Sequence, residues 1–214
     1  FRNAVACAEI REAMNRGDFT RAKDLCDRLL ARNEALVSRK LSNHYTPRYV
    51  RRFLGKIVEA GAAATAAPNR LVAVLPDRWR LAYDPDDAGE QKGYAKPGFD
   101  DGGWKEVATY SDTLNAQGLP DRKTVMWYRA RFDVPPGTEN PALFFAEIDG
   151  TAAVFVNGRP VGQQQKKRAP FTVAIGAAAR PGATVVAVRV DHSTITELDL
   201  GGILRPVLLI ARGG

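Results

Sequence analysis

The sequence predicts a mainly β protein: an antiparallel β-sandwich preceded by an α-helical segment of about three helices. Up to about residue 61, apolar residues recur at intervals of three and four, which is the spacing of amphipathic helices. From residue 71 onward, short β-rich runs alternate with turn signals, and no long helical pattern separates them. We therefore expect a helical segment over residues 1–61, a linker over 62–70 and a sandwich over 71–212.

The composition is that of a globular protein and excludes several classes. The chain has 214 residues, 45% of them hydrophobic, which is enough to bury a core and excludes a disordered or disulfide-rich scaffold. Residues 1–60 contain 13 Lys and Arg against 7 Asp and Glu, but the signs alternate along the expected helices. Mixed signs indicate a solvated face. A nucleic acid is therefore not an expected partner. No uncharged stretch is long enough to span a bilayer, so a membrane is not an expected partner either.

The helical segment begins with a predicted hairpin. Asp18 follows a glycine and is placed to accept hydrogen bonds from the first turn of a new helix, so helix one should end near Asn15 and helix two should begin near Phe19. A third helix is expected from about Pro47, stopping before Gly61. Three such helices bury little on their own, so we interpret them as the end of an upstream domain.

The two cysteines, Cys7 and Cys26, lie at similar distances from the predicted hairpin corner, one in each helix. Antiparallel helices would bring them to the same level. A disulfide and a pair of buried free thiols both fit this placement, and the sequence leaves the two open.

The strands of the sandwich are predicted from their β-rich composition. Asp149-Gly150 and Asn157-Gly158 favour tight hairpin turns, so residues 142–148, 152–157 and 160–162 should form a meander. The stretch over 78–124 is poor in strand signal but rich in aromatic residues, which predicts a long loop pinned by packing. The remaining expected strands cover residues 71–75, 125–134, 171–175, 184–190 and 203–211.

A series of short motifs occurs in a recognisable order. Trp79-Arg80-Leu81 and the acidic turn at 84–87 come first, and the later motifs are FDDGGW at 99–104, WYRARF at 127–132, VFVNG at 154–158, VAVRVD at 186–191 and GGILRPV at 201–207. No single motif is specific, but their colinear order resembles the sugar-binding domain of glycoside hydrolase family two.

This resemblance implies a jelly roll of the galactose-binding type, accessory to a separate catalytic domain. The expected function is that of a non-catalytic carbohydrate-binding or accessory domain of a larger, secreted or periplasmic glycoside hydrolase, with any signal peptide outside this sequence. The implied partners are a carbohydrate, such as a plant or algal polysaccharide or a galactoside, and an upstream catalytic domain of the same polypeptide. The alternative is a scaffold that packs on the catalytic domain and binds no sugar.

The residues support no catalysis by this chain alone. In the resembled family the catalytic carboxylates belong to a barrel, and Asn33-Glu34 falls within a predicted helix. No nucleophile elbow occurs, and His44 lies in a different segment from His192. No cofactor is expected. Calcium, which sandwiches of this type sometimes carry, is the one ion that the acidic run at 84–90 could hold, although a solvated turn explains the same run.

The best candidate ligand residues lie in the polar loop that follows the strand over 184–190. Asp191 and Glu197 could accept hydrogen bonds from sugar hydroxyls, and His192 could donate to or stack on a sugar. In the resembled family this connection can lie at the catalytic domain's sugar pocket. Tyr94 could stack on a pyranose ring if exposed. The alternatives are that the loop only caps the sandwich and that Tyr94 only packs the long loop.

Overall fold

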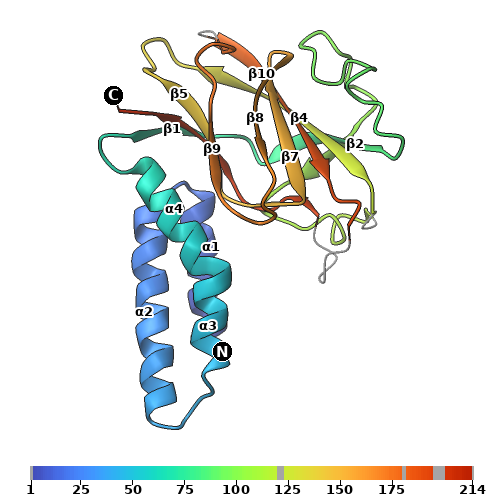
Figure 1. Ribbon diagram of the computed structural model, residues 1–214. Helices are drawn as coiled ribbons and strands as arrows, with labels where there is room; N and C mark the ends of the chain where they lie inside the picture. Colours follow the sequence, from blue (N-terminus) through green and yellow to red (C-terminus); the bar gives the residue numbers. More distant parts are fainter. Residues whose placement is uncertain (1, 120–122, 180–181, 195–200, 214) are drawn as a thin grey trace.

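The computed structural model describes residues 2–119, 123–179, 182–194 and 201–213. The helices come first in the chain and form one layer, and the strands that follow form the sheets beside it (Figure 1). The structure therefore has the predicted fold class. The helical elements are α1 (Arg2–Asn15), α2 (Phe19–Ser38), α3 (Tyr45–Val50), the π-helical turn η1 (Arg51–Gly55) and α4 (Lys56–Thr65).

The corner between α1 and α2 forms as the sequence predicts. The Asp18 carboxylate accepts a hydrogen bond from the Arg21 backbone N–H at 3.0 Å, which caps the first turn of α2. Gly17 adopts φ +76°, a conformation that glycine tolerates best. Both cysteines of the hairpin are free, with Cys26 buried and Cys7 half-buried. The thiol alternative therefore describes this structure.

The third helical stretch differs from the prediction, because it starts at Tyr45 and continues past Gly61 to Thr65. Gly61 lies against the ring of Phe19, and a β-carbon at this position would overlap that ring. The glycine thus permits close packing of α4 on the start of α2 rather than ending the helix. The residues expected to be a linker contain the last turn of α4, followed by the first strand at Arg70.

The strands form two main antiparallel sheets. The four-stranded sheet has the order β1-β12-β5-β9, and the six-stranded sheet has the order β3-β2-β4-β10-β7-β8. A short sheet pairs β6 with β11. The strands are β1 (Arg70–Val74), β2 (Arg78–Asp84), β3 (Lys105–Ala108), β4 (Val125–Val134), β5 (Pro141–Phe145), β6 (Ile148–Asp149), β7 (Thr151–Val156), β8 (Arg159–Gln164), β9 (Phe171–Ala174), β10 (Gly182–Asp191), β11 (Gly202–Ile203) and β12 (Val207–Ala211).

Two strand predictions are wrong. Asn157-Gly158 does join the hairpin β7-β8, but β5 pairs with β12 and β9 in the other sheet. Asp149-Gly150 therefore connects β6 of the short sheet to β7 of the six-stranded sheet, and the expected three-stranded meander does not form. The stretch over 78–124 also contains β2 and β3, which complete the edge of the six-stranded sheet.

The helices pack on the four-stranded sheet and extend away from it (Figure 1). Alternate side chains of this sheet face opposite ways, so Leu143 and Phe145 fill the core between the two sheets while Phe144 faces the helices. Phe144 meets Phe19 of α2 edge to face, with ring centroids 5.9 Å apart. The helical segment thus shares a hydrophobic core with the sandwich.

Candidate functional site

Asp191 is the last residue of β10 and lies half-buried at one end of the six-stranded sheet. Its carboxylate accepts hydrogen bonds from the hydroxyl of Ser193 at 2.6 Å and from the Ser193 backbone N–H at 3.0 Å. These two bonds lower the pKa of Asp191, so the group is ionised at neutral pH. Arg189 lies 4.0 Å away and is held mainly by Asp87.

His192 lies on the other side of the sheet from Asp191. It is 1% exposed, and its imidazole lies beside Gly201, next to the core residue Met126. Its backbone N–H donates to the carbonyl of Thr124 at 3.1 Å, which ties the loop to the start of β4. The structure therefore does not bring the His192 imidazole together with the Asp191 carboxylate on one surface. Glu197, the third residue expected in this loop, lies outside the described residues.

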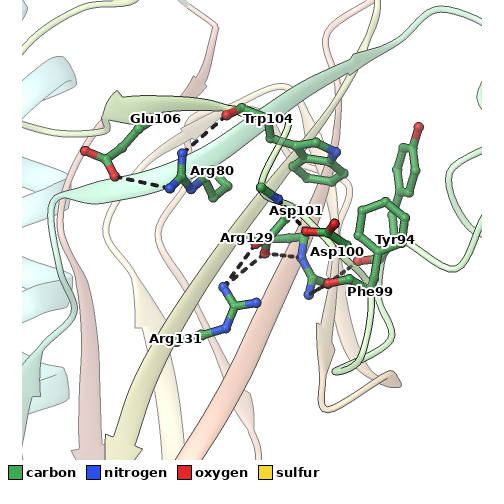
Figure 2. Close-up of polar contacts among 10 residues, drawn as sticks. Arg80, Tyr94, Phe99, Asp100, Asp101, Trp104, Glu106, Arg129 and Arg131 are labelled. Atoms are coloured by element: carbon green, nitrogen blue, oxygen red, sulfur yellow. Dashed lines mark hydrogen bonds and ion pairs between the residues drawn. The ribbon is translucent and has the colours of Figure 1, made fainter.

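Tyr94 lies on the outer face of the six-stranded sheet in a cluster of aromatic rings (Figure 2). Its ring centroid is 4.9 Å from those of Phe99 and Trp104 and 5.8 Å from that of Trp127. The ammonium group of Lys92 lies 5.8 Å from the same ring. Tyr94 is half-buried, and these contacts match the packing alternative more closely than a sugar platform.

The same outer face contains a buried ion pair (Figure 2). The side chain of Arg129 is fully buried, and its Nε donates to Asp101 Oδ2 at 2.8 Å while Nη1 donates to the carbonyl of Tyr94. Arg131 donates to both oxygens of the same carboxylate at 3.1 and 3.2 Å. Burial alone would raise the pKa of Asp101, but the hydrogen bonds from both arginines outweigh it and lower the pKa.

Two carboxylates of the acidic run at 84–90, where calcium is one expectation, bind protein groups. Asp84 is buried and accepts hydrogen bonds from the backbone N–H groups of Ala88 and Gly89 and from the Trp127 indole. Asp87 pairs with Arg189 through two bonds of 2.7 and 2.5 Å. Within the part of the chain that the structure describes, no group of three or more His, Cys, Asp or Glu side chains is arranged to hold a metal.

A second polar cluster, which the sequence patterns do not predict, lies around the buried Glu147. Glu147 is 2% exposed and pairs with Arg168 and Arg205. Asp149 is also buried, and burial raises its pKa. The sequence signal for this cluster is Glu147 itself, an acidic residue within a β-rich run. The two arginines that pair with it lie 21 and 58 residues further along the chain.

Comparison with known proteins identifies the domain. The family model for the beta-galactosidase second all-beta domain matches residues 89–196, just over half of the chain. The chain belongs to this family. The expected resemblance to glycoside hydrolase family two is therefore confirmed, and this second all-beta domain is an accessory domain of such enzymes. None of the curated proteins matches the chain.

Solved structures of three bacterial beta-glucuronidases share the fold. The enzyme of an uncultured Clostridium species is 19% identical with a TM-score of 0.56, over 68% of this chain and 29% of that one. The Ruminococcus gnavus enzyme in complex with D-glucaro-d-lactam is 18% identical with a TM-score of 0.57, over 69% of this chain and 30% of that one. The Lactobacillus rhamnosus enzyme is 22% identical with a TM-score of 0.56, over 65% of this chain and 28% of that one. The chain thus spans less than a third of each of these proteins.

Proposed function

We propose that this second all-beta domain is a carbohydrate-binding accessory module of a larger, secreted or periplasmic glycoside hydrolase. Asp191 carries the proposed site, because its carboxylate is ionised and half-buried at the end of β10, and the oxygen that Ser193 does not use can accept hydroxyl hydrogen bonds. Glu197 joins it in this proposal as a second acceptor. His192 is buried and supports the loop through its backbone bond to Thr124.

The proposed ligand is a polysaccharide or galactoside, and the proposed second partner is the catalytic domain of the same enzyme. Ligand sites of jelly-roll sandwiches are formed by loops at the ends of strands, since the sheet faces are occupied by packing. Here the faces are covered by the helices and by the aromatic cluster around Tyr94. The loop end with Asp191 is therefore the part of the sandwich best suited to a polar ligand. A polymer substrate also favours an extracellular or periplasmic site of action.

A scaffold function is the second candidate, and one observation favours it. Leu41, Tyr45 and Tyr49 belong to the helical segment and are 65%, 66% and 60% exposed. Tyr45 and Tyr49 border a hollow of about 600 Å³ that is also lined by Arg48, Arg51, Arg52, Phe53 and Lys56. Apolar side chains gathered in this way suit burial against a neighbouring domain.

None of the helices in the described residues has the length and apolar composition for a membrane crossing.

A glycan screen separates the two functions. The chain is tested on an array of galactosides, xylans and rhamnose-rich polysaccharides, with calorimetry on every positive glycan. Asp191→Ala should abolish binding. The matched control is Asp133→Ala, which removes an exposed carboxylate at the opposite end of the β4-β10 pair and should leave binding intact. Absence of binding to any glycan would favour the scaffold function.

A further inference from the structure

A polar cavity of about 260 Å³ lies in the corner between α1 and the loop end of the sandwich. Helix α1 contributes Arg11, and the sandwich contributes Arg168, Leu204 and Arg205 together with Glu147. The turn after β3, residues 109–113, forms the remaining wall with three hydroxyl-bearing residue types and Asp112. Three arginines from separate parts of the chain therefore converge on one small cavity.

Glu147 organises two of these arginines. Both Nε and Nη2 of Arg168 lie 2.7 Å from Glu147 Oε1, which uses one carboxylate oxygen for one guanidinium group. Arg205 Nε lies 3.6 Å from the other oxygen, too far for a hydrogen bond. The Leu204 N–H donates to the Glu147 carbonyl at 3.1 Å, which fixes the backbone that carries Arg205. The carboxylate thus holds two cations but fully satisfies only Arg168.

The cavity has an excess of positive charge. Among the lining residues, three arginines stand against two carboxylates, those of Glu147 and the exposed Asp112. The Arg205 side chain is only 22% exposed, and its Nε has no hydrogen-bond partner. Burial and the charges of Arg11 and Arg168 lower the pKa of Arg205, against the opposing effect of Glu147. Among the described residues, Arg11 forms no ion pair with a carboxylate. A buried donor of this kind needs a partner.

We propose that this corner binds a uronic acid unit, with the sugar carboxylate held between Arg11 and Arg205. A guanidinium group donates two parallel N–H hydrogen bonds to a planar carboxylate. A neutral sugar has no carboxylate to accept them. The cavity is slightly smaller than the roughly 300 Å³ at which drug-sized sites begin, so it suits a single sugar ring. The hydroxyls of Thr109 and Ser111 donate to Asp77, which leaves those of Tyr110 and Thr113 to contact the ring hydroxyls. This inference rests on the proposed function only in taking a sugar as the carrier of the charge.

The test is an NMR titration of the ¹⁵N-labelled chain with D-glucuronate and D-galacturonate, compared with D-glucose, D-galactose and sodium sulfate. The uronates should shift the amides of residues 109–113 and bind at least about tenfold more tightly than the neutral sugars. Arg11→Gln should weaken uronate binding by about tenfold, because it removes a charged donor. The matched control is Arg21→Gln, which removes one exposed arginine from α2 and should change nothing. Arg205→Lys keeps the charge but not the planar fork, and should also weaken binding.

Three results would overturn the proposal. The first is uronate binding no tighter than that of the neutral sugars. The second is sulfate binding as tight as that of the uronates, which would make this a site for small inorganic anions. Unchanged affinity in both arginine variants would place any binding elsewhere. Asp191→Ala separates this inference from the proposed function: a variant that loses neutral glycans and keeps uronates shows two sites. Uronate binding that depends on Arg11, in a chain that binds no neutral glycan, would support the corner site and contradict the Asp191 site.

Discussion

The buried pair of Arg129 and Asp101 allows a quantitative test of what holds the outer loop on the six-stranded sheet. Asp101→Asn keeps the shape of the side chain and removes its charge. The Arg129 side chain is fully buried and would keep only neutral acceptors, namely the carbonyls of Tyr94 and Phe99 and the amide oxygen of the substituted side chain. Removing one partner of a buried pair costs about 3–5 kcal/mol, and the remaining bonds favour the lower end, about 3 kcal/mol. For a chain of this size, that lowers Tm by about 6–12 °C.

Urea unfolding followed by tryptophan fluorescence and far-UV circular dichroism measures this loss. Asp100→Asn is the matched control, because Asp100 is exposed and should change stability by less than about 0.5 kcal/mol. The double variant Asp101→Asn with Arg129→Met leaves no buried charge and should recover part of the loss. A loss below about 1 kcal/mol in Asp101→Asn, or a double variant as unstable as the sum of both single changes, would refute the reasoning.

The acid dependence of the same pair has a defined sign. The pKa of Asp101 is lower in the folded state than its usual value of about 3.9, so the folded state binds this proton more weakly than the unfolded state. Its stabilisation is complete above that usual value and disappears as the pH falls through the lower folded value. The stability difference between the wild-type chain and Asp101→Asn should therefore shrink only below about pH 4.

Three further changes probe other parts of the molecule. Gly61→Ala should destabilise the chain by about 1–3 kcal/mol in urea unfolding, because the added carbon overlaps Phe19, whereas Gly55→Ala, with its nearest neighbour at 3.7 Å, should be neutral or stabilising; equal effects would contradict the packing argument. Asp149→Asn should raise Tm at pH 7, since the raised pKa means that ionisation opposes folding, and this gain should vanish as the pH falls below about 4; a lower Tm at pH 7 would contradict it. Cys26 is buried and its pKa is raised to about 11, so iodoacetamide should modify it only after unfolding, as mass spectrometry of the native chain would show.

Local patterns predicted much of the fold. The helical hairpin follows from Asp18 and the apolar spacing around it, and β4 and β10 follow from long β-rich runs. The prediction failed where distant residues decide the outcome. Gly61 is a helix breaker by local propensity, but the ring of Phe19 gives it a packing role. The Asp149-Gly150 turn is typical of a hairpin, yet β5 finds its partners in the other sheet.

The candidate site was predictable only in part. The polar loop after β10 was predicted because it interrupts a strand pattern, and β10 does end at Asp191, which is half-buried. His192 follows Asp191 on the opposite side of the sheet and is buried there, so the two side chains expected to share one site face different surroundings. The corner cavity depends on Arg11, which sequence reasoning assigned to a solvated helix face. Only the packing of α1 against the sandwich brings it near Arg205.

The common core of the helices and the four-stranded sheet has a mechanical consequence. The hairpin cannot tilt without withdrawing Phe19 from Phe144, so its orientation is fixed relative to the sandwich. Helix α2 has 20 residues and therefore extends about 30 Å from the sheet as a rigid arm. A domain attached ahead of α1 through a short, stiff connection would be held at a set distance and angle, and the two would tumble as one body. A carbohydrate captured by the sandwich would then always reach that domain from the same direction.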